Sequence, residues 1–185
     1  MVIKDKRIEG ENLTWILRCP TKADAGELSK LRVKIDGETE NLDREPGEGF
    51  LTKEDFERII YEDTASKTTL FLLAEVKGKI VGFTRCEGNK LSRFRHKAEF
   101  GICILKECWG YGIGKVFLEN VLMCANTAGI KKISLTVVET NGKAIELYEK
   151  YGFLEEGLLI NDRIHKDGSY YNTVIMGKFL DKNNV

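Results

Sequence analysis

The fold is decided by residues 96–125, HKAEFGICILKECWGYGIGKVFLENVLMCA. Residues 96–105 predict a strand, Gly110-Tyr-Gly-Ile-Gly114 predicts a tight turn, and apolar residues at helical spacing up to Ala125 predict a helix that Gly129 ends. A strand that ends in glycines and opens a helix presents unpaired backbone N–H groups at the positive end of the helix dipole. The turn is therefore a candidate anion site.

The segments before this centre predict a strand, two helices and a hairpin. They are a strand at 13–19, a helix at 21–37, a helix from residue 52, and hairpin strands at 68–76 and 79–86. Thr21 and Thr52 are the expected N-caps of the two helices, each with an aspartate three positions later. Lys77-Gly78 forms the hairpin turn. Between the helices, residues 38–51 form an acidic loop.

The segments after the centre predict a strand, a helix and a final pair of strands. They are a strand at 132–138, a helix from Asn141 to Tyr151 with Gly152 just beyond its end, and strands at 153–164 and 170–179. The complete order is βααβββαβαββ. We interpret it as one α/β domain across residues 1–185.

Composition and charge restrict the function classes. The chain has 185 residues, of which 42% are apolar and 31% charged, as in soluble globular proteins. Its 29 Lys and Arg residues balance 29 Asp and Glu residues, so the basic excess that usually accompanies nucleic-acid binding is missing. The longest apolar runs, such as 70–74, are far too short to cross a bilayer. We expect neither a nucleic acid nor a membrane as partner.

The cysteines and the N-terminal residues favour a reducing compartment. The 5 cysteines include no CxxC pair, so we expect free thiols, without a disulfide framework or a metal site. Residues 1–12 are polar and lack the apolar core of a signal peptide. The sequence therefore predicts a cytoplasmic protein.

Two common phosphate-binding motifs fail at the glycine turn. A Walker A loop would need a glycine at Trp109 and Ser or Thr at Val116. A dinucleotide fingerprint would need a glycine at Lys115. The turn also lies in the middle of the chain, after four predicted strands, so a nucleotide-phosphate binder is a weak alternative.

Two longer stretches carry a family resemblance. Residues 98–102 with Gly110-Tyr-Gly-Ile-Gly-Lys115 resemble motif A of the GCN5-related N-acetyltransferases, and Gly112 and Gly114 match its glycines. Residues 135–153, with Asn141 and Leu-Tyr-Glu-Lys-Tyr-Gly-Phe at 147–153, resemble motif B. The two core motifs span residues 98–153, and the ending at 167–176 resembles the branch containing the ribosomal-protein-alanine acetyltransferases. The resemblance implies a mixed, largely antiparallel sheet with helices on both faces, splayed at the glycine turn.

The resemblance implies acetyl-coenzyme A as co-substrate. The residues it assigns to cofactor binding are Ile104, Leu105, Trp109, Gly110, Tyr111, Gly112, Ile113, Gly114, Lys115 and Asn141. The pyrophosphate would rest on the amides of 110–115, and the backbone N–H near Ile104 would face the thioester oxygen. Trp109 stands where the family usually has Arg or Gln, which lowers the expected cofactor affinity. Asn141 would cap its helix and also contact the cofactor arm.

Two residues are candidates for the chemistry. Tyr148 stands where the family places the general acid that protonates the departing thiolate. The alternative role for Tyr148 is that of an aromatic side chain packed in the core. We assign this packing role to Tyr151. Glu99 is a candidate base; its alternatives are a carboxylate facing solvent or pairing with Lys97.

The other polar candidates carry smaller roles. His96 and His165 lack a readable acid partner and are expected at the surface. Cys103 and Cys108 lack an adjacent histidine, so direct attack by the amine is expected rather than a covalent acetyl-cysteine. The 5 carboxylates of residues 38–48 either attract a cationic amine or lie solvated.

The sequence thus predicts an enzyme that transfers an acetyl group from acetyl-coenzyme A to a primary amine, either a protein N-terminus or a small molecule. Its main alternative is a non-catalytic acyl-coenzyme A binding or sensing module, which Trp109 favours and Tyr148 opposes. A homodimer is a further expectation from the resemblance.

Overall fold

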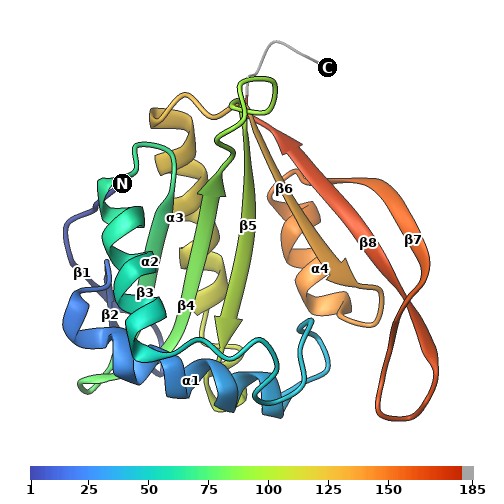
Figure 1. The fold of residues 1–185 in the computed structure, drawn as a ribbon, viewed down its shortest axis with the longest axis horizontal. Coiled ribbons are helices and arrows are strands. Elements are labelled where there is room, and N and C mark those ends of the chain that lie inside the picture. Colours follow the sequence, from blue (N-terminus) through green and yellow to red (C-terminus); the bar gives the residue numbers. More distant parts are fainter. Residues whose placement is uncertain (181–185) are drawn as a thin grey trace.

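The computed structural model describes residues 1–180, which contain one eight-stranded sheet in the order β1-β2-β3-β4-β5-β6-β8-β7 (Figure 1). The strands are β1 Lys6–Glu9, β2 Thr14–Arg18, β3 Leu70–Val76, β4 Lys79–Gly88, β5 Lys97–Ile104, β6 Lys132–Val138, β7 Leu154–Ile164 and β8 Tyr170–Phe179. The α-helices are α1 Ala25–Glu38, α2 Lys53–Ala65, α3 Ile113–Thr127 and α4 Gly142–Lys150. Only β5 and β6 pair in parallel, which confirms the mixed, largely antiparallel sheet.

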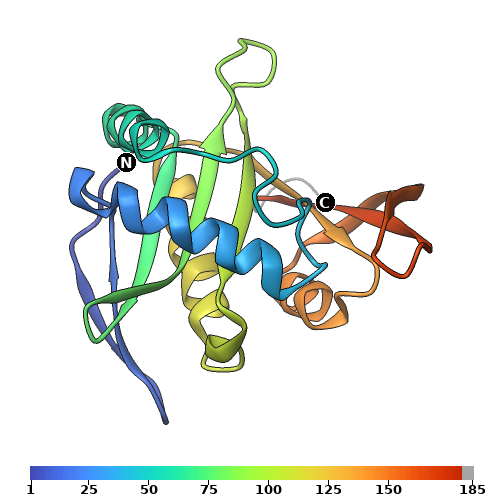
Figure 2. The ribbon, with the colours of Figure 1, turned by 60° about the horizontal axis from the view of Figure 1, so that its bottom comes forward.

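Helices cover both faces of this sheet. Figures 1 and 2 show α1 and α2 on one face and α3 and α4 on the other. Residues 70–74 of β3 are all buried, because a central strand covered on both faces has no solvent-facing side. On the α3 face, Trp15 of β2 meets Phe117 of α3 edge-on at a centroid distance of 6.1 Å. The core therefore ties the first strands to the helix that follows the glycine turn.

The predicted element order was wrong at one place, because it lacked β1. The strand KRIE at Lys6–Glu9 has three charged residues, so it carries no apolar alternation that sequence reasoning could detect. It forms through backbone pairing with β2 at the edge of the sheet, from Lys6↔Leu17 to Glu9↔Thr14. The observed order is ββααβββαβαββ. The first helix also runs one residue past Gly37, to Glu38.

The expected splay lies between β5 and β6. These strands pair only from Lys97↔Lys132 to Glu99↔Ser134, although β5 continues to Ile104 and β6 to Val138. Figure 1 shows the two ribbons diverging into a wedge that opens toward the end of β5. The second half of each strand therefore has no ladder partner on the side of the gap, although β5 stays paired with β4 and β6 with β8.

In the part of the chain that the structure describes, every helix is too short or too polar to span a bilayer.

Candidate active site

The glycine turn offers a run of free backbone donors. Gly110 and Gly112 have φ values of 85° and 80°, a region that glycine enters without strain, and Gly112 is the N-cap of α3. Among residues 1–180, no group accepts a hydrogen bond from the N–H of any residue from 110 to 115. Unpaired N–H groups at a helix N-terminus bind anions such as phosphate. The geometry fits the pyrophosphate of the expected co-substrate.

The strand before the turn presents a second free donor at Ile104. The N–H of the next residue, Leu105, donates to the Val81 carbonyl at 2.9 Å, so the Ile104 polar groups point away from β4 and toward the gap. The Trp109 indole Nε1–H donates to the Ile104 carbonyl at 2.8 Å. No described residue accepts the Ile104 N–H. Trp109 thus ties the glycine turn to the end of β5, a contact that sequence reasoning missed.

Tyr148 is a residue of α4, and its side chain is packed in the protein core beside the gap. Its side chain is 6% exposed, and its ring meets Phe100 of β5 edge-on at 6.1 Å and Phe153 at 5.8 Å. Its hydroxyl forms no hydrogen bond with residues 1–180. Burial raises the pKa of Tyr148 to about 12. The ring serves the core, and the hydroxyl remains a protonated donor, so packing and proton donation are compatible.

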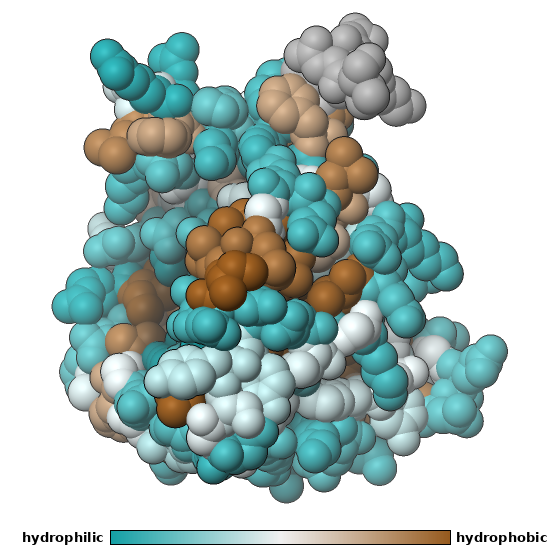
Figure 3. Space-filling model, turned by 90° about the vertical axis from the view of Figure 1, so that its right-hand side faces the viewer, coloured by the Kyte–Doolittle hydropathy of each residue, from teal (hydrophilic) through white to brown (hydrophobic). Residues whose placement is uncertain are grey.

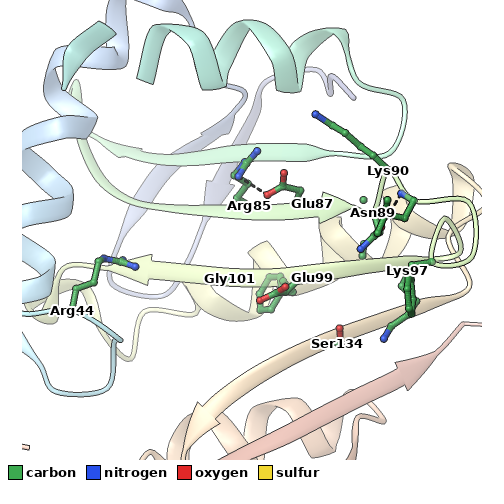
Figure 4. A pocket seen from close by; sticks show the side chains of 14 residues that line it. Arg44, Arg85, Glu87, Asn89, Lys90, Lys97, Glu99, Gly101 and Ser134 are labelled. Carbon is green, nitrogen blue, oxygen red and sulfur yellow. Dashed lines mark hydrogen bonds and ion pairs between the residues drawn. The ribbon is translucent and has the colours of Figure 1, made fainter. Parts of the chain in front are cut away.

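Glu99 faces the opposite side of β5 from Phe100. Its carboxylate is exposed and forms no hydrogen bond or ion pair with a described residue; Lys97 lies instead over the Phe94 ring, 5.9 Å from its centroid. Figure 4 shows Glu99 between the Arg85–Glu87 pair of β4 and Ser134 of β6. It lines a hollow of ≈ 760 Å³ on the α1 face, where a water-mediated base could act.

The residues assigned to cofactor binding converge at the start of α3. A Cβ added at Gly114 would contact Ile102, Ile104 and Leu147 at 3.5 to 3.8 Å, so β5, α3 and α4 meet there. Asn141 precedes α4, but its side chain makes no capping hydrogen bond, contrary to the sequence prediction. Its amide therefore stays available to a ligand.

The carboxylates of the acidic loop after α1 have partners in the chain, although Asp43, Glu45 and Glu48 are also exposed to solvent. Glu38 accepts from the Lys106 N–H at 2.7 Å, Glu40 from the Lys166 N–H at 2.7 Å, and Asp43 from Arg163 at 2.9 Å. Glu45 pairs with the Lys166 ammonium at 3.2 Å, and Glu48 accepts from the Glu45 N–H at 2.8 Å. Four of these carboxylates tie the loop to residues at or just beyond the ends of β5 and β7, and Glu48 bonds within the loop, so all five have partners before any cationic amine arrives.

Four other predicted residues have clear positions. His96 is exposed, as expected, whereas the His165 side chain is only 10% exposed, which corrects the surface prediction. Burial raises the pKa of the Cys103 thiol to about 12, so it is a poor nucleophile near neutral pH. Tyr151 packs as predicted, and its hydroxyl also donates to Glu119 of α3 at 2.5 Å.

The fold and site define the class. A glycine turn with unpaired N–H groups leads from a strand with a free N–H at its end into a helix, beside a splayed parallel pair with a buried tyrosine. This arrangement suits an extended phosphate-bearing thioester lying in the gap. The chain belongs to the acetyltransferase (GNAT) family, whose model matches residues 37–153.

Individual relatives agree with that assignment. The chain is 28% identical over 143 residues to a spermidine N(1)-acetyltransferase of Vibrio cholerae, covering 75% of this chain and 80% of that one. It is 34% identical over 87 residues to an L-amino acid N-acetyltransferase of Escherichia coli, covering 46% of this chain and 54% of the relative. The match thus spans about half the length of the second relative.

A solved structure shows the same arrangement. The acetyltransferase of the GNAT family from Streptococcus pneumoniae superposes with a TM-score of 0.85 and 30% identity, covering 89% of this chain and 99% of that chain. The expected family and fold are therefore confirmed.

Proposed function

We propose that this protein transfers the acetyl group of acetyl-coenzyme A to a primary amine by direct attack within one ternary complex. The observation that carries the proposal is the run of unpartnered N–H groups at 110–115 beside the β5–β6 gap. Acetyl-coenzyme A supplies an activated acetyl thioester. Family membership supports both the co-substrate and the reaction class.

Each site residue then has a role at a stated atom. The amides of 110–115 hold the pyrophosphate, and the side chain of Asn141 contacts the cofactor arm. The N–H of Ile104 donates to the thioester carbonyl oxygen, where negative charge develops as the amine attacks. Glu99 accepts the ammonium proton through water, and the protonated hydroxyl of Tyr148 donates to the departing sulfur. The raised pKa of Tyr148 suits a donor, because the phenol keeps its proton at neutral pH.

The acceptor is an amine whose kind the relatives leave open. One relative is named for spermidine, a polyamine, and another for L-amino acids. A protein N-terminus is the third class that the sequence suggested. We infer a single domain that works in a reducing, cytoplasmic compartment, which the free thiols support.

Calorimetric titration with acetyl-coenzyme A tests the proposal first, with coenzyme A, ATP and NAD as comparisons. We expect selective binding of the two coenzyme A forms, followed by thiol release when amines are added. Binding without turnover for any amine would favour the non-catalytic acyl-coenzyme A module. Absence of binding to both coenzyme A forms would refute the assignment of the glycine turn.

A variant pair tests the base. Glu99→Gln keeps the size of the side chain and removes its charge, and we expect kcat to fall about 100-fold, a typical general-base contribution. Glu87→Gln, on the next strand but paired with Arg85 at 2.6 Å, is the matched control and should stay within threefold of wild type (about threefold is the scatter of a neutral change). Equal effects of both changes would contradict the role of Glu99.

We also propose that a second copy of the chain packs against the exposed apolar side chains of β7, the edge strand of the sheet. Figure 3 shows an apolar patch on the side of the molecule that carries β7 and β8. The exposed apolar residues of β7 are Leu154, Leu158, Leu159, Ile160 and Ile164. Contiguous patches of this kind mark interfaces. Light scattering coupled to size exclusion should give twice the chain mass, and Ile160→Glu should halve it; a monomeric wild type would refute the dimer.

A further inference from the structure

Two buried side-chain nitrogen atoms near the gap have no hydrogen-bond partner. Among residues 1–180, the only buried side-chain nitrogen or oxygen atoms without a hydrogen bond are Arg163 Nη1 and His165 Nε2. Arg163 lies in β7 opposite Tyr171, and His165 directly follows the strand and stacks on the Tyr171 ring, so the two side chains lie on the same face. Unpartnered buried donors are rare in native proteins and call for an explanation. Their pairing at one place points to a missing ligand.

The remaining atoms of both side chains are held in place. Arg163 Nε donates to Thr173 Oγ1 at 3.1 Å and its Nη2 to Asp43 at 2.9 Å, and the side chain is 16% exposed. The His165 ring stacks on Tyr171 with centroids 4.1 Å apart. These contacts orient the two side chains and leave Nη1 and Nε2 free.

The closest carboxylates do not satisfy the free atoms. Glu40 Oε2 lies 3.9 Å from His165 Nδ1, the other ring nitrogen, which is too far for a hydrogen bond. Asp43 is bound to the Nη2 edge of Arg163, and the other carboxylates of the loop are bound elsewhere. No anion of the described chain is left for these donors. The loop carrying Glu40 and Asp43 covers them, so a ligand would reach them beneath this loop.

These two side chains lie near the open end of the β5–β6 gap. Thr173, which accepts from Arg163, pairs with Val138 of β6. Val138 is the last residue of β6, so Arg163 lies across β8 from the open end of the β5–β6 gap. A second observation agrees, because His165 and Trp109 line the same hollow of ≈ 550 Å³, and Trp109 is bonded to the Ile104 carbonyl. His165 therefore borders the hollow that reaches the end of β5, and Arg163 lies two positions before it in the chain.

The chemistry of the donors defines the ligand. The Arg163 guanidinium carries a permanent positive charge and can only donate, so Nη1 requires an oxygen acceptor, best an anionic one. The guanidinium at Nη1 and the imidazole, with its proton on Nε2, would each donate to one oxygen of a carboxylate. Spermidine has no carboxylate, and in a protein N-terminus the corresponding carbon belongs to a neutral amide.

We propose that Arg163 and His165 bind the carboxylate of the acceptor, so that the substrate is a small amino acid rather than a polyamine or a protein N-terminus. This inference rests on the proposed function of the same site. The carboxylate is held on the β7 side while the amine reaches the thioester beside Ile104.

Calorimetry on the protein saturated with coenzyme A tests this inference without requiring turnover. Each proteinogenic amino acid is compared with its own carboxamide, and spermidine and an alanyl peptide amide are included. We expect at least one amino acid to bind about tenfold or more tightly than its carboxamide, as loss of a charge-assisted hydrogen bond implies. The inference is overturned if no amino acid binds, if acids and amides bind equally, or if only spermidine or the peptide binds.

Variants tie the preference to the named residues. Arg163→Gln and His165→Phe should each reduce the acid-over-amide ratio about tenfold or more, while the affinity for acetyl-coenzyme A stays unchanged. Arg163→Lys keeps the charge in case the glutamine variant unfolds, and should lower the ratio less. Arg95→Gln removes an exposed arginine and is the matched charge control. An unchanged ratio in folded Arg163 and His165 variants would overturn the inference.

The same experiments distinguish a failure of the proposed acetyltransferase function from a failure of the amino-acid assignment. Failure to bind acetyl-coenzyme A would remove the proposed function itself. Normal binding of acetyl-coenzyme A, together with acetylation of amines that lack a carboxylate, would leave the proposed function standing and overturn only the amino-acid assignment.

Discussion

Replacing Tyr148 with phenylalanine separates a catalytic hydroxyl from a packed ring. The change keeps the edge contacts with Phe100 and Phe153, at 6.1 and 5.8 Å, and removes an oxygen that has no hydrogen-bond partner in residues 1–180. The free energy of unfolding should therefore stay within about 1 kcal/mol of wild type at neutral pH. In contrast, kcat should fall about 100-fold, roughly 3 kcal/mol of barrier, because the departing sulfur loses its proton donor.

The titration of Tyr148 gives a second measure of the same change. Burial raises its pKa from 10.0 to about 12. A group whose pKa is higher in the folded state stabilises the fold fully below its unfolded pKa and loses that contribution as pH rises to the folded pKa. Wild type should lose about 2–3 kcal/mol more than Tyr148→Phe between roughly pH 10 and pH 12.

The assay for kcat is thiol release from acetyl-coenzyme A with the acceptor that the calorimetry identifies. Denaturant unfolding measures the stability of the same variants. Tyr151→Phe is the matched control, because its hydroxyl donates to Glu119 on α3 and is assigned no proton transfer. We expect that variant to keep its kcat and to lose about 1 kcal/mol of stability at most. Wild-type kcat in Tyr148→Phe, with the acetyl-transfer step shown to limit turnover, would refute the proton-donor role.

Three further changes test the turn, the strand end and the thiol. Gly112→Ala forces φ 80° on a side chain, so it should cost about 1–2 kcal/mol of stability and weaken acetyl-coenzyme A binding in calorimetry, whereas Gly142→Ala, at an ordinary φ with open space, should stabilise by about 0.4–1 kcal/mol. Trp109→Phe removes the 2.8 Å bond to the Ile104 carbonyl and should cost about 0.5–1.5 kcal/mol in denaturant unfolding; no change would contradict the tie. Because burial raises the pKa of Cys103 to about 12, mass spectrometry should find no acetyl adduct on it after incubation with acetyl-coenzyme A, and a competent adduct would contradict direct attack.

The sequence predicted the elements whose signals are local. The strand at 132–138 has the same bounds in the structure, and Thr52 caps α2 by accepting the Asp55 N–H at 3.1 Å. Gly152, with φ 79°, ends α4 as predicted. Each of these features depends on residues that are close together in the sequence, so a short window of sequence contains the interactions that determine it.

The sequence prediction failed where the structure depends on contacts between residues that are distant in the chain. The β1 strand exists because β2 offers it a backbone ladder, although its own residues are mostly charged. Asn141 had the right position for a cap, but its side chain does not make the bond. His165 was expected at the surface because no acid was near it in sequence, yet the loop after α1 and the Tyr171 ring enclose it.

By itself, the sequence determined the α/β class, the glycine turn with its helix, and the family motifs at 98–153, because these depend on local spacing and on residue types that permit few conformations. Only the tertiary structure decided which backbone donors stay free and which buried donors lack a partner. The Ile104 N–H is free because β6 diverges from β5 after Ser134, and Arg163 keeps an open edge because Asp43 and Thr173 take the others. Hydrogen-bond satisfaction is a property of the whole assembly of strands and loops, so no single stretch of sequence can determine it.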